Sequence, residues 1–152
     1  MTIWIVEDVD NDAAVAEQAI AEVAQSRPRS STPRTFRNRT IQWQDTIEAS
    51  NQTVVSIEDC APSIVILDLF VDGNFAAQKF YNQLRHWETM RRKPKSRVIL
   101  WSVRTGLAEA QDLLSVLPRT DLRLGFTEIK EKQPLKNKLS ACWQSWEDER
   151  HQ

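Results

Sequence analysis

The chain alternates between short continuous apolar runs and longer stretches in which apolar residues return every three or four positions. The runs are rich in β-branched residues and are followed by polar ones, which is typical of strands buried on both faces of a parallel sheet. Four of these runs predict strands, at residues 3–6, 64–67, 97–102 and 122–129.

The stretches between these runs predict helices. Their apolar residues recur at helical spacing over residues 13–24, 75–87, 107–117 and 135–146. Asp10 or Asn11 can cap the first helix, which we expect to end near Gln25. Pro118 closes the third helix, and Pro134 suits the first turn of the last one.

The segment between the first two apolar runs is less regular. Residues 40–44 alternate polar and apolar side chains, which predicts a second strand near the edge of the sheet. In residues 51–60, Val54, Val55 and Ile57 favour a strand by propensity, whereas the position between two parallel strands favours a short helix. We predict the helix. Five strands alternating with helices then predict an α/β fold, a doubly wound five-stranded parallel sheet with helices on both faces.

A basic segment at about residues 26–39 interrupts this alternation. It holds five arginines, two prolines and several Ser and Thr residues, with Phe36 as its one large apolar residue. Such a composition is typical of a solvated, mobile connection, and we predict an insertion without regular structure. A docking loop for an acidic partner or a nucleic acid is the alternative. The 152 residues otherwise predict a single domain over residues 1–152.

Composition narrows the function classes. The net charge of -1 argues against a molecule built to bind nucleic acid. Cys60 and Cys142 lie far apart and form no CxxC pair, which suits a reduced compartment and buried thiols. With His86 and His151 they match no common zinc spacing. No signal peptide or membrane span is apparent, so a cytoplasmic protein without membrane contacts is expected.

Polar groups that could carry chemistry follow four of the predicted strands. Glu7 and Asp8 follow the first, Asp68 the third, Ser102 the fourth and Lys130 the fifth. Because the carboxyl ends of parallel strands share one edge of a sheet, these side chains can converge there. Clustered carboxylates repel one another unless a cation is present, and Mg²⁺ prefers such oxygen ligands. The set suits a carboxylate that attacks a phosphoryl group while a metal and a lysine neutralise charge.

This pattern resembles the receiver domain of bacterial two-component response regulators, a flavodoxin-like fold of five strand–helix repeats. The resemblance covers nearly the whole chain. It implies that Glu7, through a water, and Asp8 hold Mg²⁺ together with Asp68 and the backbone carbonyl of Phe70. It also implies the roles of the remaining motif residues, namely Asp68 as phosphoacceptor and Ser102 and Lys130 as contacts of the phosphoryl group.

The resemblance further implies a stand-alone signalling protein without an output domain. A histidine kinase or phosphotransfer protein would supply the phosphoryl group. A downstream protein would then bind the fourth helix, last strand and fifth helix. Such a protein is no enzyme beyond its own phosphorylation and dephosphorylation.

Several positions depart from the family pattern. Glu131 stands where a proline usually follows the lysine, and Lys132 competes with Lys130 for its role. The switch aromatic falls at Thr127, next to Phe126, and Val103 is larger than the usual residue after the hydroxyl. These departures motivate the alternative of a pseudo-receiver, an interaction module that is not phosphorylated.

Two further alternatives remain open. Each polar group has an ordinary structural explanation, since acids cap helices and strand-end hydroxyls bond to backbone. Asp68 after an apolar strand also resembles the phosphohydrolases of the haloacid dehalogenase family. That family requires a second Asp two residues later, where this chain has Phe70.

Overall fold

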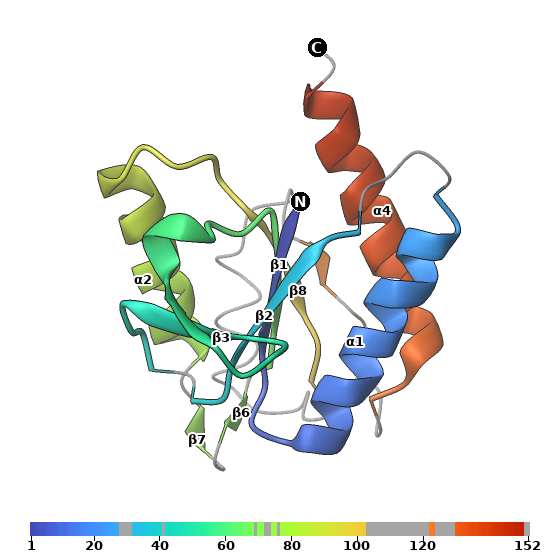
Figure 1. The fold of residues 1–152 in the computed structure, drawn as a ribbon, viewed down its shortest axis with the longest axis horizontal. Helices are drawn as coiled ribbons and strands as arrows, with labels where there is room; N and C mark the ends of the chain where they lie inside the picture. Colours follow the sequence, from blue (N-terminus) through green and yellow to red (C-terminus); the bar gives the residue numbers. More distant parts are fainter. Residues whose placement is uncertain are drawn as a thin grey trace.

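The computed structural model describes residues 1–27, 32–40, 42–68, 70–71, 74–75, 77–102, 122–123 and 130–150. Most of the elements form one α/β unit (Figure 1). They are β1 Thr2–Val6, α1 Asp10–Gln25, β2 Arg34–Asn38, β3 Thr46–Ala49, β4 Val54–Ser56, the 3-10 turn Ile57–Asp59, β5 Ile64–Leu67, β6 Phe70–Val71, β7 Asn74–Phe75, α2 Ala77–Met90, β8 Arg97–Leu100, β9 Leu122–Arg123 and α4 Lys132–Arg150. None of the described helices is long and apolar enough to cross a membrane.

The main sheet confirms the predicted parallel core and extends it at one edge. In the described part of the chain its strand order is β4-β3-β2-β1-β5-β8-β9. The five strands from β2 to β9 pair in parallel, and their order makes this a doubly wound sheet. At the β2 edge, β3 and β4 add two antiparallel strands.

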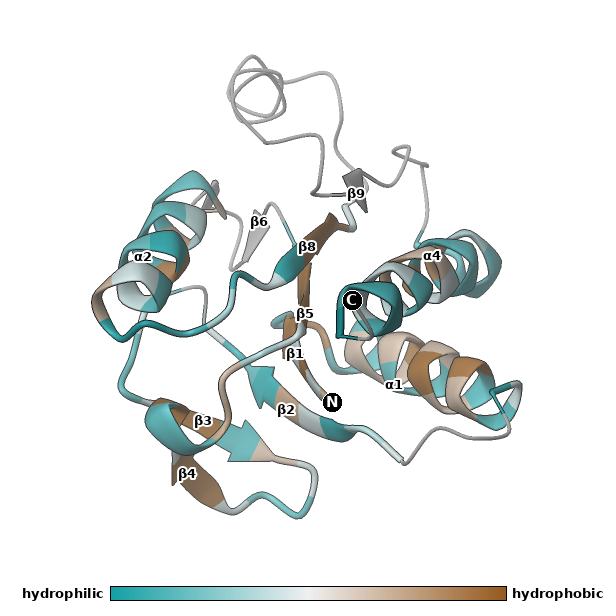
Figure 2. Ribbon diagram, turned by 90° about the horizontal axis from the view of Figure 1, so that it is seen from above, coloured by the Kyte–Doolittle hydropathy of each residue, from teal (hydrophilic) through white to brown (hydrophobic). Residues whose placement is uncertain are grey.

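Helices cover both faces of the sheet, as predicted, with α1 and α4 on one face and α2 on the other (Figure 2). Successive side chains of a strand point to opposite faces, so each central strand contributes side chains to two hydrophobic cores. Ile3, Ile5 and Ile66 pack toward α1 and α4, whereas Trp4 and Leu67 pack on the α2 side. This double burial explains why the central strands are continuous apolar runs. Cys60 and Cys142 are free thiols buried in these cores, as expected.

The second strand lies earlier than predicted. It is β2, inside the segment expected to be an irregular insertion, while the described part of residues 40–44 forms no strand. Phe36 is buried opposite Trp4 in the β1–β2 register, so one apolar residue suffices to anchor the strand. Arg37 pairs with Asp10, so its guanidinium has a carboxylate partner within the fold and does not require a solvated loop.

The predicted helix in residues 51–60 is also wrong. Val54–Ser56 forms strand β4, and only the 3-10 turn Ile57–Asp59 follows it. The β3–β4 connection turns tightly at Gln52, whose φ of 66° is left-handed. Strand propensity decides this segment because β3 offers its backbone to an antiparallel partner, which removes the need for a crossover helix.

Two helix starts differ from the prediction. The helix expected from the apolar spacing over residues 75–87 begins at Ala77, because Asn74 and Phe75 pair with Phe70 and Val71 in the two-stranded ribbon β6–β7. Helix α1 has Val9 as its N-cap residue and no side-chain cap. The predicted helix at residues 107–117, and with it Val103, Phe126 and Thr127, lies outside the described residues.

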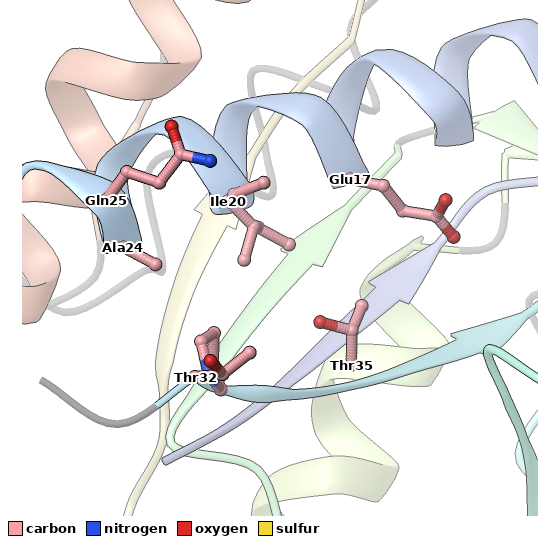
Figure 3. Close-up of a pocket in the computed structure, with 8 residues that line it drawn as sticks. Glu17, Ile20, Ala24, Gln25, Thr32 and Thr35 are labelled. Carbon is pink, nitrogen blue, oxygen red and sulfur yellow. The ribbon is translucent and has the colours of Figure 1, made fainter.

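A cavity of about 300 Å³ lies between the C-terminal half of α1 and the start of β2 (Figure 3). Its lining combines apolar residues with a few polar ones, Glu17, Ile20, Ala21, Ala24, Gln25, Thr32, Pro33 and Thr35. Arg34, which follows Pro33, pairs with Thr2 at the amino-terminal end of β1. The cavity therefore lies at the edge of the sheet opposite to the strand ends that carry Glu7 and Asp68.

Candidate functional site

The register of the central strands brings their polar ends to one edge of the sheet. Val6 pairs with Leu67, and Leu67 pairs with Leu100, so the next residues of the three strands lie at the same level. Backbone hydrogen bonds continue this alignment, from Asp68 N to Val6 O at 3.2 Å and from Trp101 N to Leu67 O at 3.0 Å. The ribbon β6–β7 lies at this same edge (Figure 1).

Three carboxylates meet there. Glu7, Asp8 and Asp68 each place an oxygen within 4.8 Å of the other two. Glu7 is 1% exposed and Asp68 is 6% exposed, so two of the three charges are held out of water. Glu7 Oε1 also accepts a hydrogen bond from Val9 N at 3.1 Å, which fixes its orientation.

Lys130 brings a positive charge into this group. Its side chain is 3% exposed, its Nζ lies 3.2 Å from Asp68 Oδ2, and it forms an ion pair with Glu7 Oε2. A fourth acid that the sequence did not single out, Asp12 in the first turn of α1, lies 3.7 Å from the same ammonium. Lys132 instead pairs with Glu22 at 2.9 Å, so of the two candidate lysines the structure places Lys130 at the acids.

The burial of these charges alters their protonation. Desolvation, followed by the nearby carboxylate of Asp68, raises the pKa of Glu7 to about 7, against the opposing effect of Lys130. For Lys130, burial alone would lower the pKa, but Asp68 and Glu7 together raise it above the usual lysine value. Lys130 therefore stays an ammonium at neutral pH, where it partly neutralises the acids.

The donor set fits a hard divalent cation. In the part of the chain that the structure describes, four carboxylates, those of Glu7, Asp8, Asp12 and Asp68, lie around the ammonium of Lys130. All of these donors are oxygens, which suit Mg²⁺, Ca²⁺ or Mn²⁺ rather than a soft metal. Glu7, Asp8 and Asp68 are the residues close enough to one another to hold such an ion.

Comparison with known proteins finds similar structures but no match by sequence. No protein-family model matches the chain, and no curated protein matches it. Its structure is similar to the N-terminal domain of a response regulator/sensory box/GGDEF three-domain protein from Carboxydothermus hydrogenoformans, with a TM-score of 0.59, 12% identity, and coverage of 99% of this chain and 100% of that one. It is also similar to the Mn²⁺-bound form of the response regulator Rcp1, with a TM-score of 0.52, 13% identity, and coverage of 95% and 93%.

This chain has the receiver-domain fold. Both neighbours are response regulators or parts of one, and the similarity runs over nearly the full length of each chain. The strand order of the parallel core agrees with it, which confirms the flavodoxin-like fold. The antiparallel strands β3 and β4 are joined to this core at its β2 edge.

Ser102 and Trp101 complete the described part of the site in this receiver fold. Ser102 is buried two residues beyond the end of β8, at the edge where the carboxylates meet. The Lys130 ammonium lies 5.1 Å from the centre of the Trp101 ring, within the range of a cation–π contact. Phe70 lies in β6. The metal-binding role of its backbone carbonyl stays a prediction.

The contact between Lys130 and Trp101 predicts an optical signal. Addition of Mg²⁺ is expected to change the tryptophan emission, because a cation among the carboxylates alters the charge that Trp101 experiences through Lys130. A fluorescence titration with MgCl₂ at constant ionic strength measures this effect. Trp101→Phe is expected to lose most of the change and Trp146→Phe to keep it. An equal change in Trp101→Phe and the unmodified protein would contradict the assignment.

The loop between β1 and α1, which carries Glu7 and Asp8, is held from β2. Arg37 Nε donates to Glu7 O at 3.0 Å, and Arg37 Nη1 donates to Asp10 Oδ1 at 2.8 Å. Arg39 also bonds to Asp10 at 2.8 Å. Two arginines of the predicted insertion thus fix the position of the acidic loop. No local pattern of residues indicates this contact, because it depends on where β2 starts.

Proposed function

We propose that this receiver-fold protein accepts a phosphoryl group on Asp68 while a divalent cation such as Mg²⁺ is held by Glu7, Asp8 and Asp68. The observation that supports this proposal is the position of the Asp68 carboxylate, which is within 4.8 Å of the other two acids and 3.2 Å from the Lys130 ammonium. That one of the structural neighbours is a Mn²⁺-bound response regulator adds support.

The transfer needs little beyond positioning. An Asp68 carboxylate oxygen attacks phosphorus, the bond from phosphorus to the donor's leaving group breaks, and an acyl phosphate forms with the electron pair leaving on the donor. Because a carboxylate is already an anionic nucleophile, no additional base is required. Lys130 compensates charge on the phosphoryl oxygens, and a bound divalent cation supplies further electrostatic stabilisation of the same oxygens.

The donor is a histidine kinase or a phosphotransfer protein, and the result is a signal rather than a turnover product. Ser102 follows strand β8, and Lys130 follows strand β9. Their bonds to the new phosphoryl oxygens therefore shift the conformational equilibrium of the elements that these strands connect. The added charge at the strand ends thereby changes the conformation of the surface, and a downstream protein binds the changed surface. The cell compartment is proposed to be the cytoplasm.

Incubation with acetyl phosphate and MgCl₂, followed by intact-mass measurement, tests the proposal. The protein is expected to gain the mass of one phosphoryl group. Asp68→Asn is expected to gain none, because an amide is too weak a nucleophile, and EDTA is expected to abolish the adduct. Asp59→Asn, which makes the same exchange at an exposed position on the 3-10 turn, serves as the control and keeps the adduct.

A pseudo-receiver is the second candidate. The contact of Lys130 with Glu7 as well as Asp68 favours it, because the ammonium already has carboxylate partners without a phosphoryl group. Absence of any adduct with acetyl phosphate, phosphoramidate or a phosphorylated phosphotransfer protein would select this candidate and reject phosphorylation. An adduct that persists in Asp68→Asn would reject Asp68 as the acceptor.

A further inference from the structure

A second concave feature lies between α2 and the segment before β3 that carries Trp43, on the face of the sheet opposite to α4. It is a cavity of about 460 Å³, here called the tryptophan pocket, whose lining is Trp43, Gln83, His86, Trp87, Met90 and Arg91. Helix α2 is separated from α1 and α4 by the sheet (Figure 2), so this pocket is independent of the α4 side of the molecule. Its volume is in the range of cavities that hold a large side chain or a small ligand.

The floor of the pocket is closely packed. Trp43 packs against Trp4, Phe80 and Trp87, with ring centroids 6.1, 5.5 and 5.7 Å apart. Trp87 Nε1 also donates to Glu58 Oε1 at 3.2 Å, which fixes the indole. Aromatic pairs at these separations hold one another in place. A ligand that enters the pocket therefore meets a surface that is already ordered and loses little free energy in arranging it.

The rim of the pocket exposes an apolar side chain. Met90 ends α2 with 66% of its surface exposed, although most large apolar residues in the described ranges are buried. Tryptophan, methionine and arginine are enriched at the centres of protein interfaces, and the pocket lining includes all three types, with no Lys, Glu, Asp, Ser or Ala. Methionine adapts to partners of different shape. These features indicate a protein ligand.

Cations outnumber acids beside the pocket, where the neighbouring acid Glu58 pairs with Arg91. Glu88 is the only acid in α2, and it is buried against Arg85 and the backbone N–H of Ser96. The exposed part of this helix therefore carries no negative charge. The segment that follows the helix is basic and contributes Arg91, Arg92, Lys93 and Lys95.

The end of α2 fixes the backbone that carries the first of these cations. Lys93 N donates to Glu88 O at 2.9 Å, and Arg92 takes a left-handed φ of 54°, as in a Schellman motif. Arg91 Nε lies 3.1 Å from Glu58 Oε1, and its side chain remains 61% exposed. A backbone of defined geometry thus presents several cations next to an apolar pocket.

We propose that the tryptophan pocket binds an acidic peptide segment of a partner protein. An aromatic or aliphatic side chain of the peptide enters between Trp43, Trp87 and Met90, and neighbouring carboxylates pair with the cations from Arg91 to Lys93. Charge complementarity selects this occupant. A nucleic acid would need cations along a groove that tracks its backbone, whereas here they cluster at one end of a helix.

Selection from a phage-displayed library of short random peptides, with the full chain as bait, tests this proposal. Enriched peptides are expected to be acidic around one large apolar residue. Fluorescence anisotropy of the strongest labelled peptide then gives the affinity. Met90→Glu and Arg91→Gln are each expected to weaken binding at least about tenfold, through a charge at the pocket and a lost ion pair. Gln18→Glu, which changes the net charge by the same amount on exposed α1, keeps the affinity.

Three outcomes would overturn the proposal. One is that no acidic peptide is enriched, or that the affinity is unchanged in both pocket variants. Another is binding of a labelled oligothymidylate that Met90→Glu abolishes, which would assign the pocket to nucleic acid. The third is concentration-dependent self-association, measured by sedimentation, that Met90→Glu abolishes, which would assign it to a second copy of this chain. Thermal unfolding of each variant checks that it is folded. None of these results depends on phosphorylation of Asp68.

Discussion

Lys130→Met is expected to lower the free energy of unfolding by about 3–5 kcal/mol when divalent cations are absent, because a buried ion pair loses one partner. The ammonium lies among Glu7, Asp68 and Asp12, and its removal deprives their carboxylates of this cation. Addition of Mg²⁺ is expected to recover part of this loss and to bind more tightly than in the unmodified protein, since a competing cation has been removed. Urea unfolding in EDTA and in MgCl₂ measures both effects.

Lys132→Met is the matched control. Lys132 lies two residues away, pairs with Glu22 and is about one-third exposed, so its loss is expected to change stability by less than about 1 kcal/mol. Equal destabilisation by the two substitutions would show that the charge of Lys130 has no special role. A loss in Lys130→Met that Mg²⁺ does not reduce would contradict cation binding by the acids.

Glu88→Ala is expected to destabilise the fold by about 3 kcal/mol, again because a buried pair is broken. Glu88 Oε1 accepts from Arg85 Nη1 at 2.8 Å, and Oε2 accepts from the backbone N–H of Ser96 at 2.7 Å. Arg85 also bonds to Ser96 O at 2.8 Å, so these groups join the end of α2 to the start of β8. Truncation leaves a guanidinium and a backbone donor without this carboxylate in a place with little water.

The same urea unfolding measurement tests the Glu88 prediction. Glu17→Ala, at an exposed position in α1, provides the comparison and is expected to shift stability by no more than about 0.5 kcal/mol. If Glu88→Ala were as mild as Glu17→Ala, the network would contribute little. Binding of Mg²⁺ is expected to be unchanged in Glu88→Ala, since Glu88 is remote from the carboxylates at the strand ends.

The central strands were predictable because each is buried on both faces. Residues such as Ile5 and Val65 are apolar whichever side of the sheet they face, so the run itself indicates a strand. β2 lies nearer the edge and has Phe36 as its one buried large residue, and its arginines are satisfied by acids distant in sequence. Local composition therefore suggested a loop where pairing with β1 produces a strand.

The same reasoning applies to the site. The positions of Glu7, Asp68 and Lys130 follow from a simple rule, that parallel strands end at a common edge, and the structure places the three together. Asp12 and Arg37 reach the site from a helix and from β2, and their distances depend on details of packing that a one-dimensional pattern does not contain. The predictions for Val103 and Thr127 lie outside the described residues and stay predictions.

The hairpin of β3 and β4 has a consequence for solubility. It takes the place of a crossover helix and leaves an exposed edge of the sheet. The edge strand is the three-residue β4, with Val54 exposed at its start. A long flat margin would offer its backbone to other molecules as a template for aggregation, whereas a strand this short provides few donors and acceptors. Lengthening β4 by insertion of alternating valine and threonine residues is expected to promote the formation of sheet-rich aggregates.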